Sequence, residues 1–350
     1  MKKNLLAVVL ASALAFGMIG CGDEPSNSEP KTEAQEDASK DKETKTNSED
    51  TVNEAEPMPE DGSEESSDET ADETTDTEEV VFEGPDNKNI QFFDIPDGTT
   101  KVGDKAFQRC KELEDITIPN SVKELGEYAF NQCDSLTSIT IPEGCEILRT
   151  QAIGQCMNLT SVELPQSVRV IDIGAFAGDT SLQKVIMPDK LDMLGQAVFM
   201  DCSSLTDINI PVVEEIPKNT FDGTALTKVE IPEGVKIIGD GAFGCKNTLT
   251  EVILPSTLES IGYGAFRGQP LTELTLPNGL TTIGESAFGG CSELTITLPE
   301  SVSQIGNSAF YDCKVVRVPK SVLNSLGVRE DGFKKSYADE WSETVIEVIE

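Results

Sequence analysis

The 350-residue chain contains no histidine and only one tryptophan, and aromatic residues make up 5% of it. Without histidine the sequence lacks the commonest general base and the commonest metal ligand, which excludes Ser-His-Asp and Cys-His catalysis. Basic residues are also scarce, since 27 Lys and Arg stand against 63 Asp and Glu. Nucleic-acid binding requires cations that neutralise phosphates, and base stacking requires aromatic side chains. We therefore predict no catalytic residue, no cofactor, no metal site and no nucleic-acid partner.

The first 20 residues combine two lysines, a short apolar run and small residues before Cys21. This pattern is typical of a secretory signal peptide, and the apolar run is too short for a membrane span. The sequence MIGC at residues 18–21 resembles a bacterial lipobox, which predicts that Cys21 is lipidated and anchors the chain to a membrane. The alternative is an ordinary signal peptide followed by an incidental cysteine.

Residues 21–84 form an acidic segment rich in Glu, Asp, Ser and Thr. Within it, residues 22–80 hold 23 acidic residues and four lysines, a net charge of −19. Such a composition buries too little apolar surface to offset chain entropy, which predicts a disordered tether between the membrane and a folded domain. The alternative is a calcium-binding or partner-binding tail, although no spaced Asp-x-Asp-x-Asp-Gly loop supports calcium.

Residues 85–319 repeat one pattern. A proline closes each short I-x-[IL]-P run, and successive prolines are 20 to 23 residues apart. The prolines are Pro96, Pro119, Pro142, Pro165, Pro188, Pro211, Pro232, Pro255, Pro277, Pro299 and Pro319. A second marker, usually Ala-Phe, keeps the same step from Phe107 to Phe310. A fixed period in this range is typical of a leucine-rich-repeat solenoid.

Each repeat predicts the same local structure. Over residues 136–141, leucine and isoleucine alternate with threonine and serine, which predicts a short half-buried strand ended by Pro142. In the preceding repeat, Gly126 permits a tight corner, and Ala129 and Phe130 lie on the inward face of a short helical turn. One repeat cannot offset its own chain entropy, so the repeats must stack. The sequence thus predicts an α/β leucine-rich-repeat solenoid of about 10–11 repeats, each of about 23 residues with a strand and a short helical turn.

The block I-P-x-x-[VL]-x-x-[IL]-G-x-x-A-F-x-x-C-x-x-L-x-x-[IVL] resembles the BspA-like leucine-rich repeats of bacterial surface proteins, also called the Treponema pallidum type. The resemblance covers about residues 85–320. It implies a protein exposed on the bacterial surface. Some members of this family bind fibronectin or fibrinogen, or attach the cell to host or other microbial cells.

Residues 320–350 depart from the repeat, and we predict that they form a C-terminal cap over the last coil. The alternative is an aromatic recognition patch around Tyr337 and Trp341.

Seven cysteines occupy, or nearly occupy, one position in successive repeats. They are Cys110, Cys133, Cys156, Cys202, Cys245, Cys291 and Cys313. We expect a column of buried thiols that pack as small hydrophobic side chains, because Asp179 and Thr224 replace cysteine in two repeats. Disulfides between neighbouring coils stay an open alternative.

Two rows of outward strand positions, two and four residues before each proline, provide a surface for a partner. The candidate residues on this face, which we expect to be concave, are Thr117, Thr140, Glu163, Ile186, Asn209, Glu230, Ile253, Thr275, Lys184 and Lys228. Repeat solenoids commonly bind proteins along such faces. The alternative is a solvated sheet face with no partner, because threonine suits strands in any case.

Together these patterns predict a monomeric, non-catalytic, lipid-anchored protein of the bacterial cell surface. Its solenoid is expected to bind an extracellular or cell-surface protein, in adhesion to host matrix proteins or to other cells. The alternative is a structural or scaffolding component of the cell envelope that binds the cell's own surface proteins.

Overall fold

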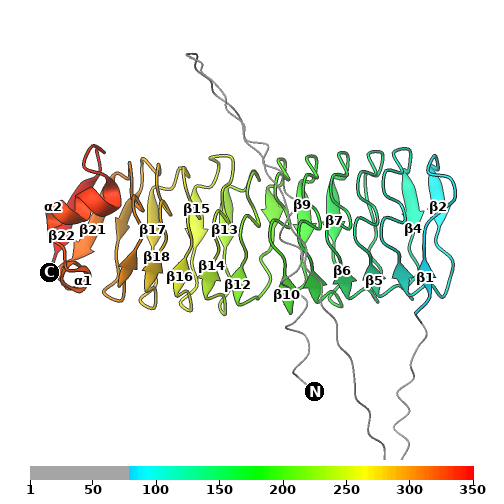
Figure 1. Ribbon diagram of the computed structural model, residues 1–350, viewed down its shortest axis with the longest axis horizontal. Helices are drawn as coiled ribbons and strands as arrows, with labels where there is room; N and C mark the ends of the chain where they lie inside the picture. Colours follow the sequence, from blue (N-terminus) through cyan, green and yellow to red (C-terminus); the bar gives the residue numbers. More distant parts are fainter. Residues whose placement is uncertain (1–78) are drawn as a thin grey trace, which may run out of the picture. The chain divides into compact units, whose positions relative to one another are not determined.

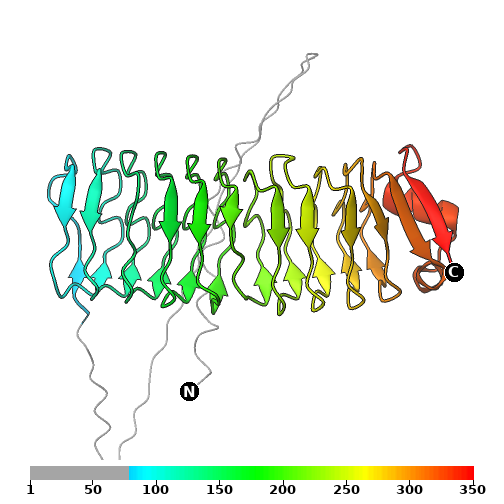
Figure 2. The ribbon, with the colours of Figure 1, turned by 180° about the vertical axis from the view of Figure 1, so that it is seen from behind.

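The computed structural model describes residues 79–350, which form a solenoid of stacked coils (Figures 1 and 2). The predicted signal peptide, the lipobox with Cys21 and nearly all of the acidic segment lie outside the described residues. Consecutive coils lie side by side along the long axis, from β1 at one end to the C-terminal helices at the other.

Most coils contribute one strand to each of two sets, which Figure 1 shows as an upper and a lower row of arrows. The first set, just before the coil prolines, comprises β2 (Phe92–Asp94), β4 (Asp115–Thr117), β7 (Ser161–Glu163), β9 (Lys184–Ile186), β11 (Asp207–Ile208), β13 (Lys228–Glu230), β15 (Glu251–Ile253), β17 (Glu273–Thr275), β19 (Thr295–Thr297) and β21 (Val315–Pro319). The second set, called here the second sheet, comprises β1 (Val81–Phe82), β3 (Lys101–Val102), β5 (Glu124–Leu125), β6 (Ile147–Leu148), β8 (Val170–Ile171), β10 (Met193–Leu194), β12 (Glu215–Ile216), β14 (Ile237–Ile238), β16 (Ser260–Ile261), β18 (Thr282–Ile283) and β20 (Gln304–Ile305).

Strand pairing joins equivalent residues of neighbouring coils in a parallel register. Val162 of β7 lies opposite Val185 of β9, for example, and Leu125 of β5 lies opposite Leu148 of β6. The middle residue of most three-residue strands is buried between two exposed ones, because successive side chains of a strand point to opposite faces. The alternation read from the sequence therefore matches the observed strands.

The predicted short helical turn is present as a series of tight turns. Amide groups here bond alternately within the coil and to the next coil: Ala106 N–H donates to Gly103 O (3.2 Å), and Phe107 N–H donates to Ala129 O (2.7 Å). Lys105 and Arg109 have positive φ angles of 62° and 64°, which no continuous right-handed helix contains. Every second N–H group of the turn therefore donates a hydrogen bond to the next coil and not within its own coil. We call the stacked Gly-x-x-Ala-Phe-x-x-Cys segments the turn column.

Phenylalanine rings of the turn column form a stacked spine in the core. From Phe176 to Phe310, ring centroids of neighbouring coils are 5.2 to 5.9 Å apart, and the rings are nearly parallel. Phe107 and Phe130 stack in the same way at 5.1 Å, and the buried Ile153 separates the two stacks. Aromatic pairs at such distances add to the free energy gained by burial. The predicted leucine-rich-repeat solenoid is confirmed.

The corner glycine Gly126 lies close to the preceding coil. A Cβ atom there would lie 2.7 Å from the carbonyl oxygen of Val102, so a side chain at Gly126 would have to displace its neighbour. Most coils keep glycine at this corner, but Arg149, Asp172 and Pro217 occupy it in three of them.

The coil at residues 207–216 interrupts both strand sets. In the first set β11 pairs with β9 but not with β13, and in the second sheet β10 and β12 belong to separate sheets. The turn column continues through the same coil, since Phe199 N–H donates to Thr220 O and Phe221 N–H donates to Ala242 O, both at 2.9 Å.

After β21 the chain forms α1 (Lys320–Leu326), α2 (Glu330–Phe333), the π-helix η1 (Lys334–Ala338) and β22 (Val345–Ile349), which pairs parallel to β21. Phe333 is fully buried and stacks on Phe310 at 6.3 Å, and Tyr337 packs edge-on against Phe333 at 5.0 Å. These two rings cover the last coil of the spine. Trp341, by contrast, is 87% exposed.

Candidate protein-binding face

The outward positions two and four residues before each coil proline form one surface, called here the strand face. The ten residues that the sequence proposes for binding, Thr117, Thr140, Glu163, Ile186, Asn209, Glu230, Ile253, Thr275, Lys184 and Lys228, are all exposed. Their exposure follows from the alternation of side chains along a strand, because most of them flank a buried middle residue such as Val185 or Val229. Their role in binding stays a prediction.

The parallel register arranges these residues in lines that cross the strands. Glu163 lies opposite Ile186, Glu230 opposite Ile253, and Thr275 opposite Thr297. Neighbouring strands in a sheet are about 4.8 Å apart, so side chains of adjacent coils on one line are in contact range. A partner that lies across the coils would therefore meet one such side chain at every step.

Two lysines of the strand face are paired with acids of the next coil. Lys184 Nζ lies 2.9 Å from Asp207 Oδ2, and Lys228 Nζ lies 2.7 Å from Glu251 Oε1. Hydrogen bonds to these carboxylates raise the pKa of both lysines. The positive charges that the sequence offers for binding are thus neutralised within the face.

Asn209 serves the fold. Its Oδ1 accepts a hydrogen bond from Met187 N–H (2.8 Å), and its Nδ2 donates to Met187 O (3.0 Å). The strand β11 has only two residues, and at its end the side-chain amide of Asn209 makes the hydrogen bonds to the neighbouring coil that a third strand residue would otherwise make. Of the ten candidates, Asn209 is the one whose side chain bonds to the backbone of a neighbouring coil within residues 79–350.

A shallow groove of about 510 Å³ crosses the strand face near its C-terminal end. It is lined by Glu273, Leu274, Thr275, Leu276, Asn278, Thr295, Thr297, Leu298, Pro299, Glu300 and Arg317. Asn278 and Glu300 each directly follow a coil proline, a third exposed row that the sequence reasoning did not include. Counting forward from the prolines would have found it, since the row contains five acidic residues.

The repeat pattern has a direct counterpart among known families. The family described as BspA type Leucine rich repeat region matches residues 78–206 and 214–326 with six copies, well over half of the chain. The chain belongs to this BspA-type leucine-rich repeat family. It is accordingly a repeat-based protein-interaction protein, and a leucine-rich-repeat solenoid of this type is typically a non-enzymatic scaffold.

Several solved bacterial repeat structures are similar to this BspA-type chain. A leucine-rich repeat protein from Bacteroides ovatus is 22% identical, over 75% of this chain and 85% of that one, with a TM-score of 0.38. A leucine-rich cell surface protein from Faecalibacterium prausnitzii is 25% identical, over 75% and 88%, with a TM-score of 0.42. The pneumococcal vaccine antigen PcpA is 19% identical, over 77% and 83%, with a TM-score of 0.46. Comparison with curated protein sequences found no match.

Within residues 79–350 of the BspA-type chain, no cluster of three or more Cys, Asp or Glu side chains is arranged to hold a metal ion. None of the helices in this part of the chain has the length and apolar character needed to cross a bilayer.

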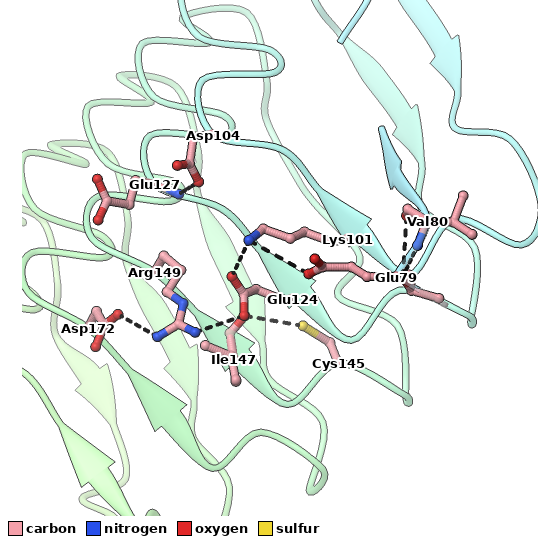
Figure 3. Close-up of polar contacts among 11 residues, drawn as sticks. Glu79, Val80, Lys101, Asp104, Glu124, Glu127, Cys145, Ile147, Arg149 and Asp172 are labelled. Carbon is pink, nitrogen blue, oxygen red and sulfur yellow. Dashed lines mark hydrogen bonds and ion pairs between the residues drawn. The ribbon is translucent and has the colours of Figure 1, made fainter. Parts of the chain in front are cut away.

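On the second sheet, the BspA-type coils carry a line of alternating charges (Figure 3). Glu124 accepts from Lys101 (3.1 Å) and from Arg149 (2.9 Å), and Arg149 also reaches Asp172 (3.5 Å). Burial would raise the pKa of Glu124, but the hydrogen bonds from Arg149 and Lys101 outweigh it and lower the pKa. Hydrogen bonding to Glu124 in turn raises the pKa of Lys101 and of Arg149. These charges satisfy one another and stabilise neighbouring coils.

The BspA-type cysteine column has a hydrogen-bonding role. Its seven cysteines, and Cys145 outside the column, are buried and free of disulfides. Six of these thiols donate to a phenylalanine carbonyl of the preceding coil, as Cys133 Sγ does to Phe107 O at 3.2 Å. Burial raises the pKa of Cys245 to about 11 and of Cys291 to about 12, so both remain thiols. The expectation of buried, unpaired thiols agrees with this geometry.

Asp179 is an exception within the column. It is completely buried, its Oδ1 accepts from Cys156 N–H at 2.7 Å, and its Oδ2 has no hydrogen-bond partner. Burial raises the pKa of Asp179 well above its ordinary value, and the neighbouring Cys156 adds to this effect. A carboxyl group that replaces a thiol thus leaves one buried polar atom unsatisfied.

Proposed function

We propose that this BspA-type protein is a non-catalytic surface protein whose strand face binds an extracellular or cell-surface protein. The observation that carries the proposal is the exposed face, with side chains aligned coil by coil within each run of paired strands and a groove at its C-terminal end. Such a face offers many weak contacts and no enclosed reaction site, as expected of a binding scaffold.

The proposed location rests on the N-terminal sequence. A signal peptide and a lipobox at Cys21 would export the protein and attach it to the membrane, and the acidic segment that follows would hold the solenoid away from the lipid surface. Adhesion, to host matrix proteins or to other cells, is the role proposed for a solenoid presented in this way. We propose that the protein performs this role as a monomer.

A retention experiment tests the proposal. The full chain is immobilised and exposed to fibronectin, to fibrinogen and to extracts of host and bacterial surface proteins. The double variant Ile186→Asn/Ile253→Asn replaces two exposed apolar residues of the strand face without changing its charge; they are 38% and 43% exposed. The matched control is Ile237→Asn on the second sheet, which is 37% exposed.

The proposal would be supported if the wild-type chain and the control retained a protein saturably and the double variant retained at least tenfold less of it. Retention that the double variant leaves unchanged would refute the strand face as the binding surface. Chemical cross-linking on intact cells then separates the two biological roles, since partners from the same cell envelope indicate a scaffolding component and foreign partners indicate adhesion.

A further inference from the structure

The charges on the strand face and on the row after each proline are strongly unequal. These rows contain twelve acidic residues and four basic ones. The acidic residues are Asp94, Asp97, Asp115, Glu143, Glu163, Asp189, Asp207, Glu230, Glu233, Glu251, Glu273 and Glu300. The groove shows that the rows form one surface at the C-terminal end, because Glu273, Thr297 and Glu300 line it together.

All four basic residues of these rows are already paired. Lys184 and Lys228 bind Asp207 and Glu251 of the next coil. The other two bases pair with acids near the C-terminus. Arg317 Nε lies 2.8 Å from Glu347 Oε2 in β22, and Lys320 pairs with Glu350. No cation of the strand face is left to meet an anionic partner.

The acidic residues are left mostly unpaired. Ten of the twelve form no ion pair within residues 79–350: Asp94, Asp97, Asp115, Glu143, Glu163, Asp189, Glu230, Glu233, Glu273 and Glu300. All ten are exposed and recur along the stack of coils. At physiological ionic strength charges act over about 8 Å, so carboxylates one or two coils apart reinforce one another. The result is a band of negative potential along the face.

The second sheet shows that neighbouring coils can pair acids with bases. There, the acid Glu124 lies between Lys101 and Arg149, and the exposed Glu214 is paired with Lys236 at 3.0 Å. The fold can therefore place compensating cations next to its carboxylates, whereas on the strand face and the row after each proline it does so for only two of twelve acids.

As an extension of the proposed function, we propose that the partner presents a Lys- and Arg-rich protein segment that lies across the coils along the strand face. Positive side chains would meet a carboxylate at most steps, and this complementarity would speed association and select against anionic partners. In the groove, the exposed Glu273 and Glu300 offer two carboxylates without an ion-pair partner to the charged end of a lysine.

The test uses the full chain and a fluorescent peptide of alternating Lys and Thr, with an alternating Glu and Thr peptide as the negative probe. Binding is measured by fluorescence anisotropy at 50 mM and 300 mM salt. The face variant is Glu163→Gln/Glu230→Gln/Glu273→Gln. The matched control, Glu146→Gln/Glu215→Gln/Glu259→Gln, removes three exposed carboxylates beside the second sheet. Both variants lower the total charge equally, so attraction by the acidic N-terminal segment is the same in each.

We expect the Kd of the basic peptide to rise roughly 3- to 100-fold in the face variant and to change less than about 2-fold in the control, with weaker binding at the higher salt. The acidic peptide should not bind. Equal losses in the two variants, or no loss in the face variant, would overturn the inference of a basic partner. The proposed function is tested independently by Ile186→Asn/Ile253→Asn. It would still stand if that variant abolished protein retention, and it would be refuted if retention were unchanged.

Discussion

The turn column and the strands respond differently to the irregular coil at residues 207–216. Both strand sets are interrupted there, and the family match also leaves out residues 207–213. The turn column passes through unbroken, with Phe199 and Phe221 stacked at 5.7 Å. The comparison indicates that the turns and their phenylalanines hold the coils together, whereas the strands tolerate variation and present outward side chains.

The largest effect is expected where this comparison is tested directly, at Phe221. Phe221→Ala should destabilise the protein by about 3–5 kcal/mol, because it removes a buried ring from the spine. Because neither strand set is continuous through this coil, loss of the ring should separate unfolding into two transitions. Ile208→Ala, in the strand β11 of the same coil, should lower the free energy of unfolding by less than half as much. Urea denaturation would contradict the comparison if the strand variant were the more damaging.

Asp179→Cys should stabilise the turn column at the position of its buried, unsatisfied carboxyl group. The variant restores the thiol of the column and removes an unsatisfied carboxyl oxygen, which should stabilise the protein by about 1–3 kcal/mol at pH 8. Because the pKa of Asp179 is raised in the folded state, its contribution is most favourable below the unfolded pKa and is lost as the pH rises through the folded pKa. The gain from the variant should therefore be smaller at pH 4 than at pH 8. A gain that is the same at both values would contradict this account.

The charged line of the second sheet should contribute less. Glu124→Gln should lower the free energy of unfolding by about 1–2 kcal/mol at pH 7, because it leaves Lys101 and Arg149 without their half-buried partner. The folded pKa of Glu124 is lowered, so its contribution is present above the unfolded pKa and is lost as the pH falls through the folded pKa. The difference between wild type and variant should thus shrink on acidification. Glu215→Gln, an exposed residue of the same row, is the control and should have almost no effect.

The smallest effect is expected on the strand face. Lys184→Gln breaks the exposed pair with Asp207 and should leave the free energy of unfolding almost unchanged, because solvent screens this pair. If thermal or urea denaturation showed a larger loss, the strand face would have a structural role that the comparison assigns to the turn column.

Sequence reasoning located the repeat, the core and the exposed rows because every coil places equivalent residues in equivalent surroundings. Phe130 and Cys133 are buried, and Thr117 and Glu163 are exposed, as the alternation and spacing indicate. It did not find the turn geometry in detail, since positive φ values at residues as different as Lys105 and Ser308 have no common sequence signal.

The sequence by itself determined the period, the inward and outward sides of each coil and the predominance of negative charge. Only the tertiary structure decided which charges are neutralised, that Asn209 completes a strand ladder, and that residues before and after the prolines line one groove. The physical reason is that these outcomes depend on contacts between side chains about one coil apart in sequence, some 20 to 23 residues. Their geometry is set by the stacking of coils and not by any local pattern.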